Sequence, residues 1–137
     1  MINGNTALVG LLGQPVQHSL SPVIQNAALA AMNLNWCYLA LPCESKDLKN
    51  VLTCLLALNC KGLNITIPHK EKIAKLCTTL SPIAKRVGAV NTLIPNTKGG
   101  WHGTNTDVRG FIQPLLKAKW EDRKALVLGC GGSARAV

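Results

Sequence analysis

Short apolar runs alternate with helix-like segments along almost the whole chain of 137 residues. The apolar runs that predict strands are residues 7–12, 36–41, 62–67, 90–95 and 100–104. The segments that predict helices are residues 22–32, 46–58, 68–76, a short stretch from Pro82, and 107–119. Regular alternation of strand and helix is typical of an α/β fold, in which helices flank a mostly parallel sheet. Turn residues 96–99 predict a hairpin between the last two of these strands.

Serine and proline mark where several helices should begin. A serine side chain accepts a hydrogen bond from the free N–H groups of the first turn, and proline suits the first helical position. We therefore expect Ser21, Ser45 and Ser81 to cap the helices that follow them. By the same logic, Pro68 should lie in the first turn of a helix, together with Lys70.

The charge balance is strongly basic, with 15 Lys and Arg against 6 Asp and Glu. The basic residues are spread along the chain, and no aromatic residues alternate with them as in a groove for single-stranded nucleic acid. We therefore expect no nucleic-acid partner. The longest apolar segments, such as residues 51–58, are too short to cross a membrane, and residues 1–6 lack the features of a signal peptide. The sequence predicts a soluble cytoplasmic protein without membrane contact.

The six cysteines include no C-x-x-C pair. Zinc sites in proteins use closely spaced ligand pairs of this kind, so we expect no metal site. Free thiols in a reducing compartment account for these cysteines.

The segment Asn64-Ile65-Thr66-Ile67-Pro68-His69-Lys70 joins a short strand to a lysine at the start of a helix. Strand alternation places Asn64 and Thr66 on one face of the sheet. A cation is poorly placed at the positive end of a helix dipole. Lys70 is therefore either an exposed residue that solvent screens or a group with a function.

Three further polar clusters follow or interrupt strand-like runs. They are residues 18–22 (His-Ser-Leu-Ser-Pro), 88–92 (Gly-Ala-Val-Asn-Thr) and 103–107 (Gly-Thr-Asn-Thr-Asp). Open α/β sheets gather ligand groups where strands end. Each cluster taken alone is also explained by turns and caps, and Asp107 in particular could cap the helix after it.

A second unit begins near the end of the sequence. Residues 124–128 predict a short buried strand, and the glycine-rich residues 129–136 follow it. Glycines at such a turn let backbone N–H groups approach a pyrophosphate. A nucleotide-binding βαβ unit needs about 30 residues, which are not present here. We therefore expect the N-terminal part of a longer protein, with one domain over residues 1–107 and the start of a Rossmann-type domain over residues 108–137.

The four clusters and the glycine turn, in this order, resemble the shikimate dehydrogenase family over Leu8 to Val137. The resemblance implies an NADP-dependent oxidoreductase of aromatic amino-acid biosynthesis that reversibly reduces 3-dehydroshikimate to shikimate. It implies Lys70 and Asp107 as the catalytic pair. The residues that it implies at the substrate are Ser19 and Ser21 at the carboxylate, and Asn64, Thr66, Lys70, Asn91 and Asp107 at the ring. The residues that it implies at the cofactor are Gly129, Gly131, Gly132, Ser133 and Ala134.

Two other functions fit the same motifs. One is a quinate/shikimate dehydrogenase that prefers NAD, and the other is a non-catalytic module that binds a small molecule. Oligomeric state is left open, a homodimer included. We expect this piece alone to bind ligand weakly and to show no turnover, because the cofactor domain is incomplete. His18 is expected on a surface loop, and His69 is expected to be exposed or on the cofactor side.

Overall fold

The computed structural model describes residues 2–119 and 124–137, which form one six-stranded sheet. The strands are β1 (Ala7–Gly13), β2 (Trp36–Pro42), β3 (Gly62–Ile65), β4 (Thr79–Leu80), β5 (Thr92–Pro95) and β6 (Trp101–Thr104). Their spatial order is β2-β1-β3-β5-β6-β4. The pairs β1–β2, β1–β3 and β4–β6 are parallel, whereas β3–β5 and β5–β6 are antiparallel. The predicted α/β fold is confirmed, and the predicted hairpin forms the antiparallel pair β5–β6.

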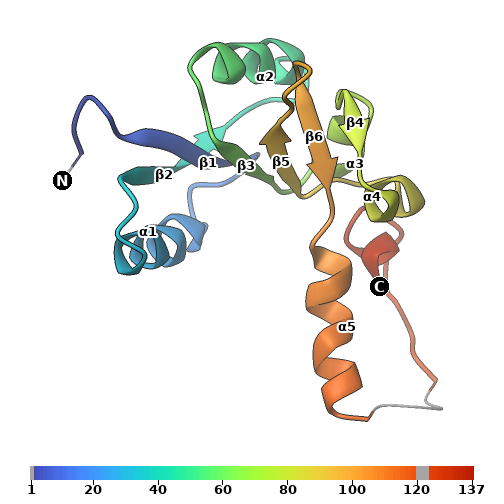
Figure 1. Cartoon of the computed structure of the whole chain (residues 1–137). Coiled ribbons are helices and arrows are strands. Elements are labelled where there is room, and N and C mark those ends of the chain that lie inside the picture. The colour runs from blue at the N-terminus through green and yellow to red at the C-terminus, as the bar shows by residue number, and fades with distance from the viewer. Residues whose placement is uncertain (1, 120–123) are drawn as a thin grey trace.

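Helices lie on both faces of this sheet. They are α1 (Ser21–Ala31), α2 (Leu48–Ala57), α3 (Lys70–Ala74), α4 (Pro82–Val87), α5 (Asp107–Lys117) and the 3-10 helix η1 (Ala134–Ala136). In Figure 1, α1 lies below the sheet and α2 lies above it. Figure 1 also shows α5 extending away from the sheet, after which the chain returns so that η1 lies near α4.

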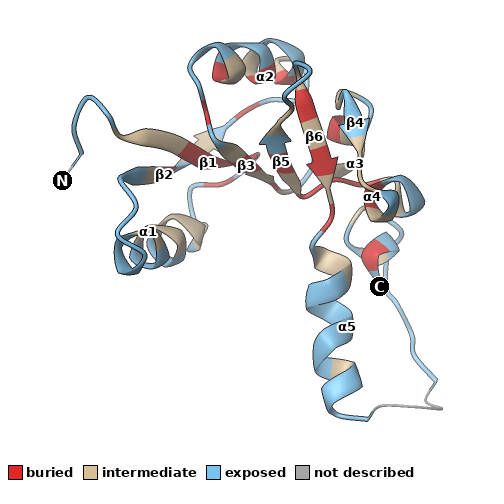
Figure 2. Ribbon diagram, viewed as in Figure 1, coloured by how far each residue is buried: buried red, intermediate tan, exposed pale blue. Residues whose placement is uncertain are grey.

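The core consists of two groups of buried side chains. The larger group joins α2 and α3 to the sheet, and its fully buried members include Leu12, Leu48, Ile73 and Leu93. The smaller group packs against α1 through Leu29 and consists of Val9, Leu11, Val16 and Tyr38. Figure 2 shows buried residues concentrated in the sheet, whereas α5 is almost wholly exposed. Side chains from both faces of the sheet are therefore packed against helices.

Two of the predicted serine caps are wrong. α1 begins at Ser21 itself and α2 begins at Leu48, and neither start has a side-chain cap hydrogen bond. Ser19 Oγ instead accepts a hydrogen bond from the N–H of Ser21 at 3.2 Å. Ser45 Oγ lies 3.3 Å from Nδ1 of His69. Capping preference is a local tendency, and here Ser19 rather than Ser21 bonds at the start of α1, while the Ser45 hydroxyl has a partner far along the chain.

The other two predicted helix starts have different outcomes. Ser81 caps α4 as predicted, since its Oγ accepts the N–H of Ala84 at 3.2 Å. The helix predicted from Pro68 begins only at Lys70, and the strand before it ends at Ile65. A turn therefore separates this strand from the helix, but Lys70 keeps its predicted place in the first helical turn.

Residues 124–128 do not form the predicted buried strand. They have no regular secondary structure, and Leu126 and Leu128 are 86% and 88% exposed. A strand is stabilised by hydrogen bonds to a neighbouring strand, and none lies beside this segment in the described part of the chain. β4, a two-residue strand beside β6, has no counterpart among the predicted strands.

Within the described residues, no helix is long and apolar enough to cross a membrane. The same residues contain no group of three or more His, Cys, Asp or Glu side chains that could hold a metal ion. All six cysteines are described and are free thiols.

Candidate active site

Three strands bring the polar clusters to one edge of the sheet. Because β5 runs antiparallel to β3 and β6, the start of β5 lies beside the ends of both neighbours. Asn64 pairs with Thr92, and Thr92 pairs with Thr104. The residues just before β5 and just after β6 therefore meet beside the turn that follows β3.

An ion pair between Lys70 and Asp107 lies at this edge. Lys70 is the first residue of α3 and Asp107 is the first residue of α5, and Lys70 Nζ donates to Asp107 Oδ2 at 2.7 Å. The two side chains are 17% and 32% exposed, so the pair is partly withdrawn from solvent yet reachable. The positive end of the α5 dipole favours a carboxylate at this position. An ammonium held in this way can exchange a proton with an oxygen of a bound ligand.

Asn91 connects the start of β5 to the start of α5, which carries Asp107. Its Nδ2 donates to Asp107 Oδ1 at 2.7 Å and to Thr106 Oγ1 at 2.9 Å. Its Oδ1 accepts the N–H of Thr106 and the hydroxyl of Thr92, both at 2.9 Å. Both oxygens of Asp107 are thus engaged, one by Lys70 and one by Asn91. The orientation of the carboxylate is therefore fixed.

Asn105, and not Asp107, caps α5. Asn105 Oδ1 accepts the N–H of Asp107 at 2.9 Å and that of Val108 at 3.4 Å, and its Nδ2 donates to the carbonyl of Ala89 at 3.1 Å. This leaves the carboxylate of Asp107 free to face Lys70. Asn105 belongs to the predicted polar cluster of residues 103–107, but the sequence predicted no capping role for it, although asparagine is a preferred cap residue.

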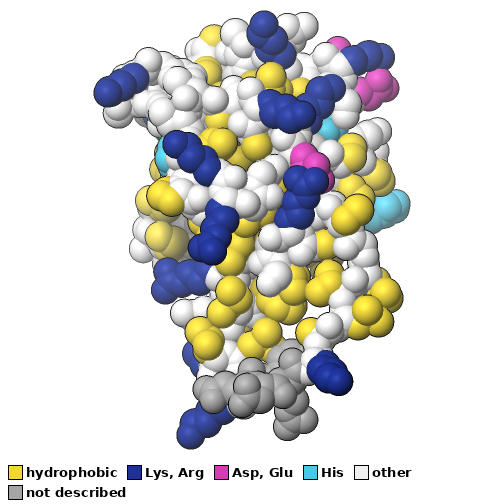
Figure 3. Space-filling model, turned by 90° about the vertical axis from the view of Figure 1, so that its right-hand side faces the viewer, with side chains coloured by type: hydrophobic (Ala, Val, Ile, Leu, Met, Phe, Trp, Pro, Cys, Tyr) yellow, Lys and Arg dark blue, Asp and Glu magenta, His cyan; other side chains and the backbone are white. Residues whose placement is uncertain are grey.

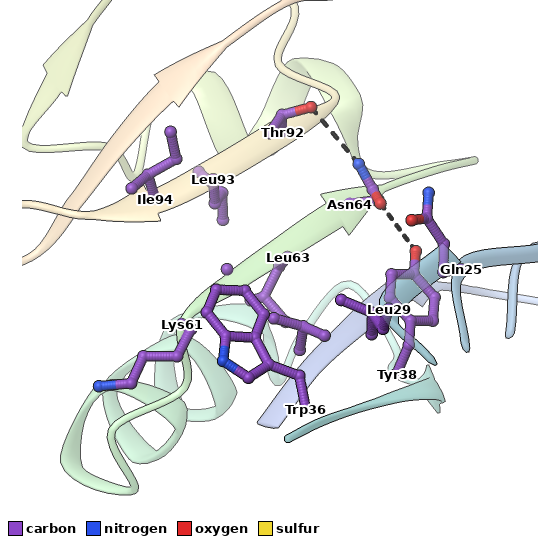
Figure 4. A pocket seen from close by; sticks show the side chains of 12 residues that line it. Gln25, Leu29, Trp36, Tyr38, Lys61, Leu63, Asn64, Thr92, Leu93 and Ile94 are labelled. Carbon is purple, nitrogen blue, oxygen red and sulfur yellow. Dashed lines mark hydrogen bonds between the residues drawn. The ribbon is translucent and has the colours of Figure 1, made fainter. Parts of the chain in front are cut away.

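A chain of hydrogen bonds extends from Tyr38 toward the ion pair (Figure 4). Tyr38 Oη donates to Asn64 Oδ1 at 2.8 Å, and Asn64 Nδ2 donates to Thr92 Oγ1 at 3.4 Å. Thr92 Oγ1 in turn donates to Asn91. Burial raises the pKa of Tyr38 to about 12, so its hydroxyl stays protonated. No sequence signal marked Tyr38, because it lies inside an apolar strand.

Figure 4 also shows the hollow beside Asn64, of about 200 Å³, which Trp36, Leu29 and Ile94 line together with Tyr38. Asn64 and Thr92 supply polar groups at one end of this mainly apolar hollow. Asn64 thus lies on the hydrogen-bond chain as well as at a concave surface.

The two serines that are predicted to bind the substrate carboxylate lie together in a separate hollow. Ser19, Ser21, His18 and Thr66 are among the residues that line this space of about 250 Å³. Hydroxyl groups can orient an anion without adding charge. Thr66 also borders the hollow beside Lys70, so it lies between the serines and the lysine. His18 is exposed, as predicted.

The glycine turn lies against the start of α3. It lines a hollow of about 440 Å³ together with Thr66, Pro68 and Lys70. Gly129 has φ +115°, which favours glycine, and a Cβ built on Gly129 or Gly131 would meet no atom within 4 Å. The backbone at these two glycines is therefore open to the close approach of a ligand.

Two contacts tie the glycine turn to α3. Lys70 Nζ donates to Ser133 Oγ at 3.3 Å, and Arg135 forms an ion pair with Glu71 at 3.5 Å. A Cβ on Gly132 would lie 3.1 Å from Cβ of Lys70, so only a residue without a side chain packs here without displacement. Ala134, the last residue of the predicted cofactor group, also lines the hollow.

The prediction that His69 is exposed or on the cofactor side is wrong. The side chain is fully buried, and its Nε2 lies 2.7 Å from the carbonyl oxygen of Cys43. The loop between β2 and α2 covers the ring. Sequence spacing alone could not reveal this contact, since the two residues lie 26 positions apart.

Comparison with known proteins gives consistent matches. A family model described as "Shikimate dehydrogenase substrate binding domain" matches residues 11–93. A Prochlorococcus marinus protein named "Shikimate dehydrogenase (NADP(+))" is 53% identical over 100% of this chain and 48% of its own length. Shikimate dehydrogenase from Aquifex aeolicus superposes with a TM-score of 0.91 at 44% identity, over 100% of this chain and 52% of that chain. A Thermus thermophilus shikimate 5-dehydrogenase has been solved in complex with NADP(H) and shikimate. It superposes with a TM-score of 0.84 at 39% identity, over 96% of this chain and 50% of that chain.

The chain spans about half the length of the curated relatives that it matches. The family model alone covers more than half of the chain and includes the serine cluster, Lys70 and Asn91. The chain belongs to the shikimate dehydrogenase family.

Proposed function

We propose that the protein to which this chain belongs catalyses the NADPH-dependent, reversible reduction of 3-dehydroshikimate to shikimate. The observation that carries this proposal is the ion pair of Lys70 and Asp107 at 2.7 Å, with Asn91 on the second carboxylate oxygen. The family membership and the NADP(+) in the names of the relatives support the substrate and the cofactor.

Lys70 and Asp107 are the proposed proton-transfer pair. NADPH, when bound, would supply a hydride to the ketone carbon, and negative charge would then develop on the ketone oxygen. Lys70 Nζ neutralises that oxygen by giving it a proton, and Asp107 holds the ammonium in place. In the reverse direction the neutral amine of Lys70 would take the proton of the hydroxyl group, and NADP+, when bound, would accept the hydride.

The proposed substrate contacts divide by chemistry. The hydroxyls of Ser19 and Ser21 hold the carboxylate, and Asn64, Thr66 and Asn91 meet the ring hydroxyls. Support comes from the shared hollow of the two serines and from the position of Thr66 between that hollow and Lys70. Amide and hydroxyl groups suit a cyclic polyol, because each of them can both donate and accept hydrogen bonds.

The proposed cofactor contacts are the backbone groups of the glycine turn. Gly129, Gly131, Gly132, Ser133 and Ala134 would hold the pyrophosphate, and the open backbone at the first two glycines supports this. We propose the corresponding division into a substrate domain over residues 1–107 and the start of a cofactor domain over residues 108–137.

The test uses the full-length protein and follows NADPH absorbance. Lys70→Ala should lower kcat by about 10²- to 10⁴-fold, because proton transfer to the developing alkoxide is lost. Lys75→Ala, at an exposed lysine directly after α3, serves as the matched control and should keep wild-type turnover. Near-normal kcat in Lys70→Ala would refute the proposed role. Assays with NADPH against NADH, and with shikimate against quinate, separate this activity from that of an NAD-preferring quinate dehydrogenase.

A further inference from the structure

His69 stands directly before Lys70 and makes contacts that the proposed reaction does not require. Its ring is fully buried. Nε2 lies 2.7 Å from the carbonyl oxygen of Cys43, and Nδ1 lies 3.3 Å from Ser45 Oγ. Lys72 Nζ donates to the carbonyl of Ser45 at 2.6 Å. The loop of residues 43–45 therefore touches the start of α3 at three points.

The partners of the ring determine where its proton lies. A carbonyl oxygen can only accept, so Nε2 carries hydrogen and donates to Cys43. The hydroxyl of Ser45 can donate to Nδ1. A neutral imidazole with its hydrogen on Nε2 thus satisfies both nitrogens, and this tautomer is inferred from the partners.

The backbone of His69 connects this contact to Lys70. His69 N–H donates to the carbonyl of Thr66 and its own carbonyl accepts from Ile73, both at 2.9 Å. The carbonyl of Lys70 accepts the N–H of Val90, also at 2.9 Å. α3 has only five residues, and so short a helix is held in place by tertiary contacts rather than by its own hydrogen bonds.

We propose that His69 is a positioning residue that aims Lys70 at Asp107 by fixing the start of α3 to residues 43–45. Its consequence for turnover rests on the proposed function, whereas its consequence for the geometry of Lys70 does not. A side chain that only fills the volume of the His69 ring is not sufficient for this role, because the buried carbonyl of Cys43 needs a hydrogen-bond donor.

A matched pair of variants separates hydrogen bonding from volume. His69→Phe keeps an aromatic ring but has no donor. His69→Gln keeps an N–H close to the position of Nε2 and can still reach Cys43. Ser45→Ala removes the partner of Nδ1 without altering the buried ring. Leu55→Ala, in the core on α2, controls for general loss of stability.

The first measurement needs no catalysis and uses this chain. Lysines are reductively methylated, and the rate of modification of Lys70 is read by mass spectrometry against exposed Lys98 as the internal reference. His69→Phe should raise the relative rate at Lys70 about threefold, because local opening frees the ammonium from Asp107. His69→Gln should stay near wild type, and Ser45→Ala should lie between the two. No change in His69→Phe and Ser45→Ala, or an equal rise in Leu55→Ala, would overturn the proposal.

The second measurement uses the full-length protein. His69→Phe should lower kcat about tenfold with little change in KM for shikimate, and His69→Gln should restore most of the loss. If Lys70 becomes more reactive in His69→Phe while Lys70→Ala keeps full turnover, the positioning claim stands and the proposed function fails. If kcat falls equally in His69→Phe and His69→Gln, the hydrogen bond to Cys43 is not the cause and the positioning claim fails.

Discussion

Two buried amides, Asn91 and Asn105, hold the candidate site together. Asn91 orients the carboxylate of Asp107, and Asn105 fixes the start of α5. They are 8% and 4% exposed, and the polar atoms of both side chains have partners. Removing such an amide leaves unpaired groups behind, and this costs more than the hydrogen bond itself contributed.

Asn105→Ala should lower the free energy of unfolding of this chain by about 1–3 kcal/mol. The N–H of Asp107 and the carbonyl of Ala89 both lose their partner. Urea denaturation measures the change. Gln113→Ala, at an exposed position on α5, is the control and should stay within about 0.5 kcal/mol of wild type. Equal effects in the two variants would contradict the assigned cap.

The raised pKa of Tyr38 predicts that the stability of the chain depends on pH in the alkaline range. Its pKa rises from 10.0 to about 12 on folding, so the folded chain holds the proton more tightly. The stability that the protonated Tyr38 side chain adds to the folded state is complete below about pH 10. It is lost as the pH rises to about 12. The stability of wild type relative to Tyr38→Phe should therefore fall by up to roughly 3 kcal/mol across that range.

Urea denaturation at a series of pH values tests this expectation. Burial also raises the pKa of Cys77 to about 11, but this thiol is present in both proteins, so its effect cancels in the difference. A difference that is constant from pH 9 to 12 would count against a tightly held phenol proton.

β6 packs closely against the side chains of Cys77 and Val90, and Gly103 permits this. A Cβ built on Gly103 would lie 2.7 Å from Cys77 Sγ and 2.8 Å from Cγ2 of Val90. β6 leads directly to Asn105 and Asp107. The placement of this strand therefore influences the geometry of the site.

Gly103→Ala should destabilise the chain by about 1–3 kcal/mol, because the added methyl group overpacks the core. Gly110→Ala is the matched control. A Cβ on Gly110 would meet nothing within 4 Å, and alanine is the better helix former in α5, so this variant should gain up to about 1 kcal/mol. Thermal unfolding measures both variants. If both variants change the stability of the chain in the same direction, the packing at β6 is not the cause.

The molecule consists of a packed sheet domain and an extended C-terminal part. α5 has no buried residue, and the described residues after it contact the start of α3 through Ser133 and Arg135. Figure 1 shows η1 returning close to α4. On the face that Figure 3 shows, the basic side chains are scattered rather than gathered in one band. A positive surface of this kind favours anionic ligands in general, without selecting among them.

This chain alone should bind shikimate weakly and should not reduce 3-dehydroshikimate. The proposed carboxylate and ring contacts lie in this chain, which spans about half the length of its curated relatives. Calorimetry with shikimate and an NADPH absorbance assay test the two statements. Replacing both Ser19 and Ser21 by alanine should remove the binding, and binding that survives this change would place the ligand elsewhere.

Local patterns along the sequence predicted much of this fold. The strands from β1 to β3, the hairpin of β5 and β6, and the positions of α1, α2 and α5 followed from hydrophobic periodicity and turn residues. The polar clusters that meet at one edge were also identified, because α/β sheets collect such groups where strands end. Two-residue β4 was missed, since a strand that short has no periodicity to detect.

Amino-acid order thus specified the α/β pattern and the residue types at the site, because periodicity and turn chemistry act between near neighbours. Contacts between distant segments specified the rest. Burial of His69 depends on the loop at Cys43, the cap of α5 is Asn105 anchored to Ala89, and Ser45 bonds to a histidine instead of a helix end. Residues 124–128 show the same dependence, since an apolar segment becomes a strand only where another strand can accept its hydrogen bonds.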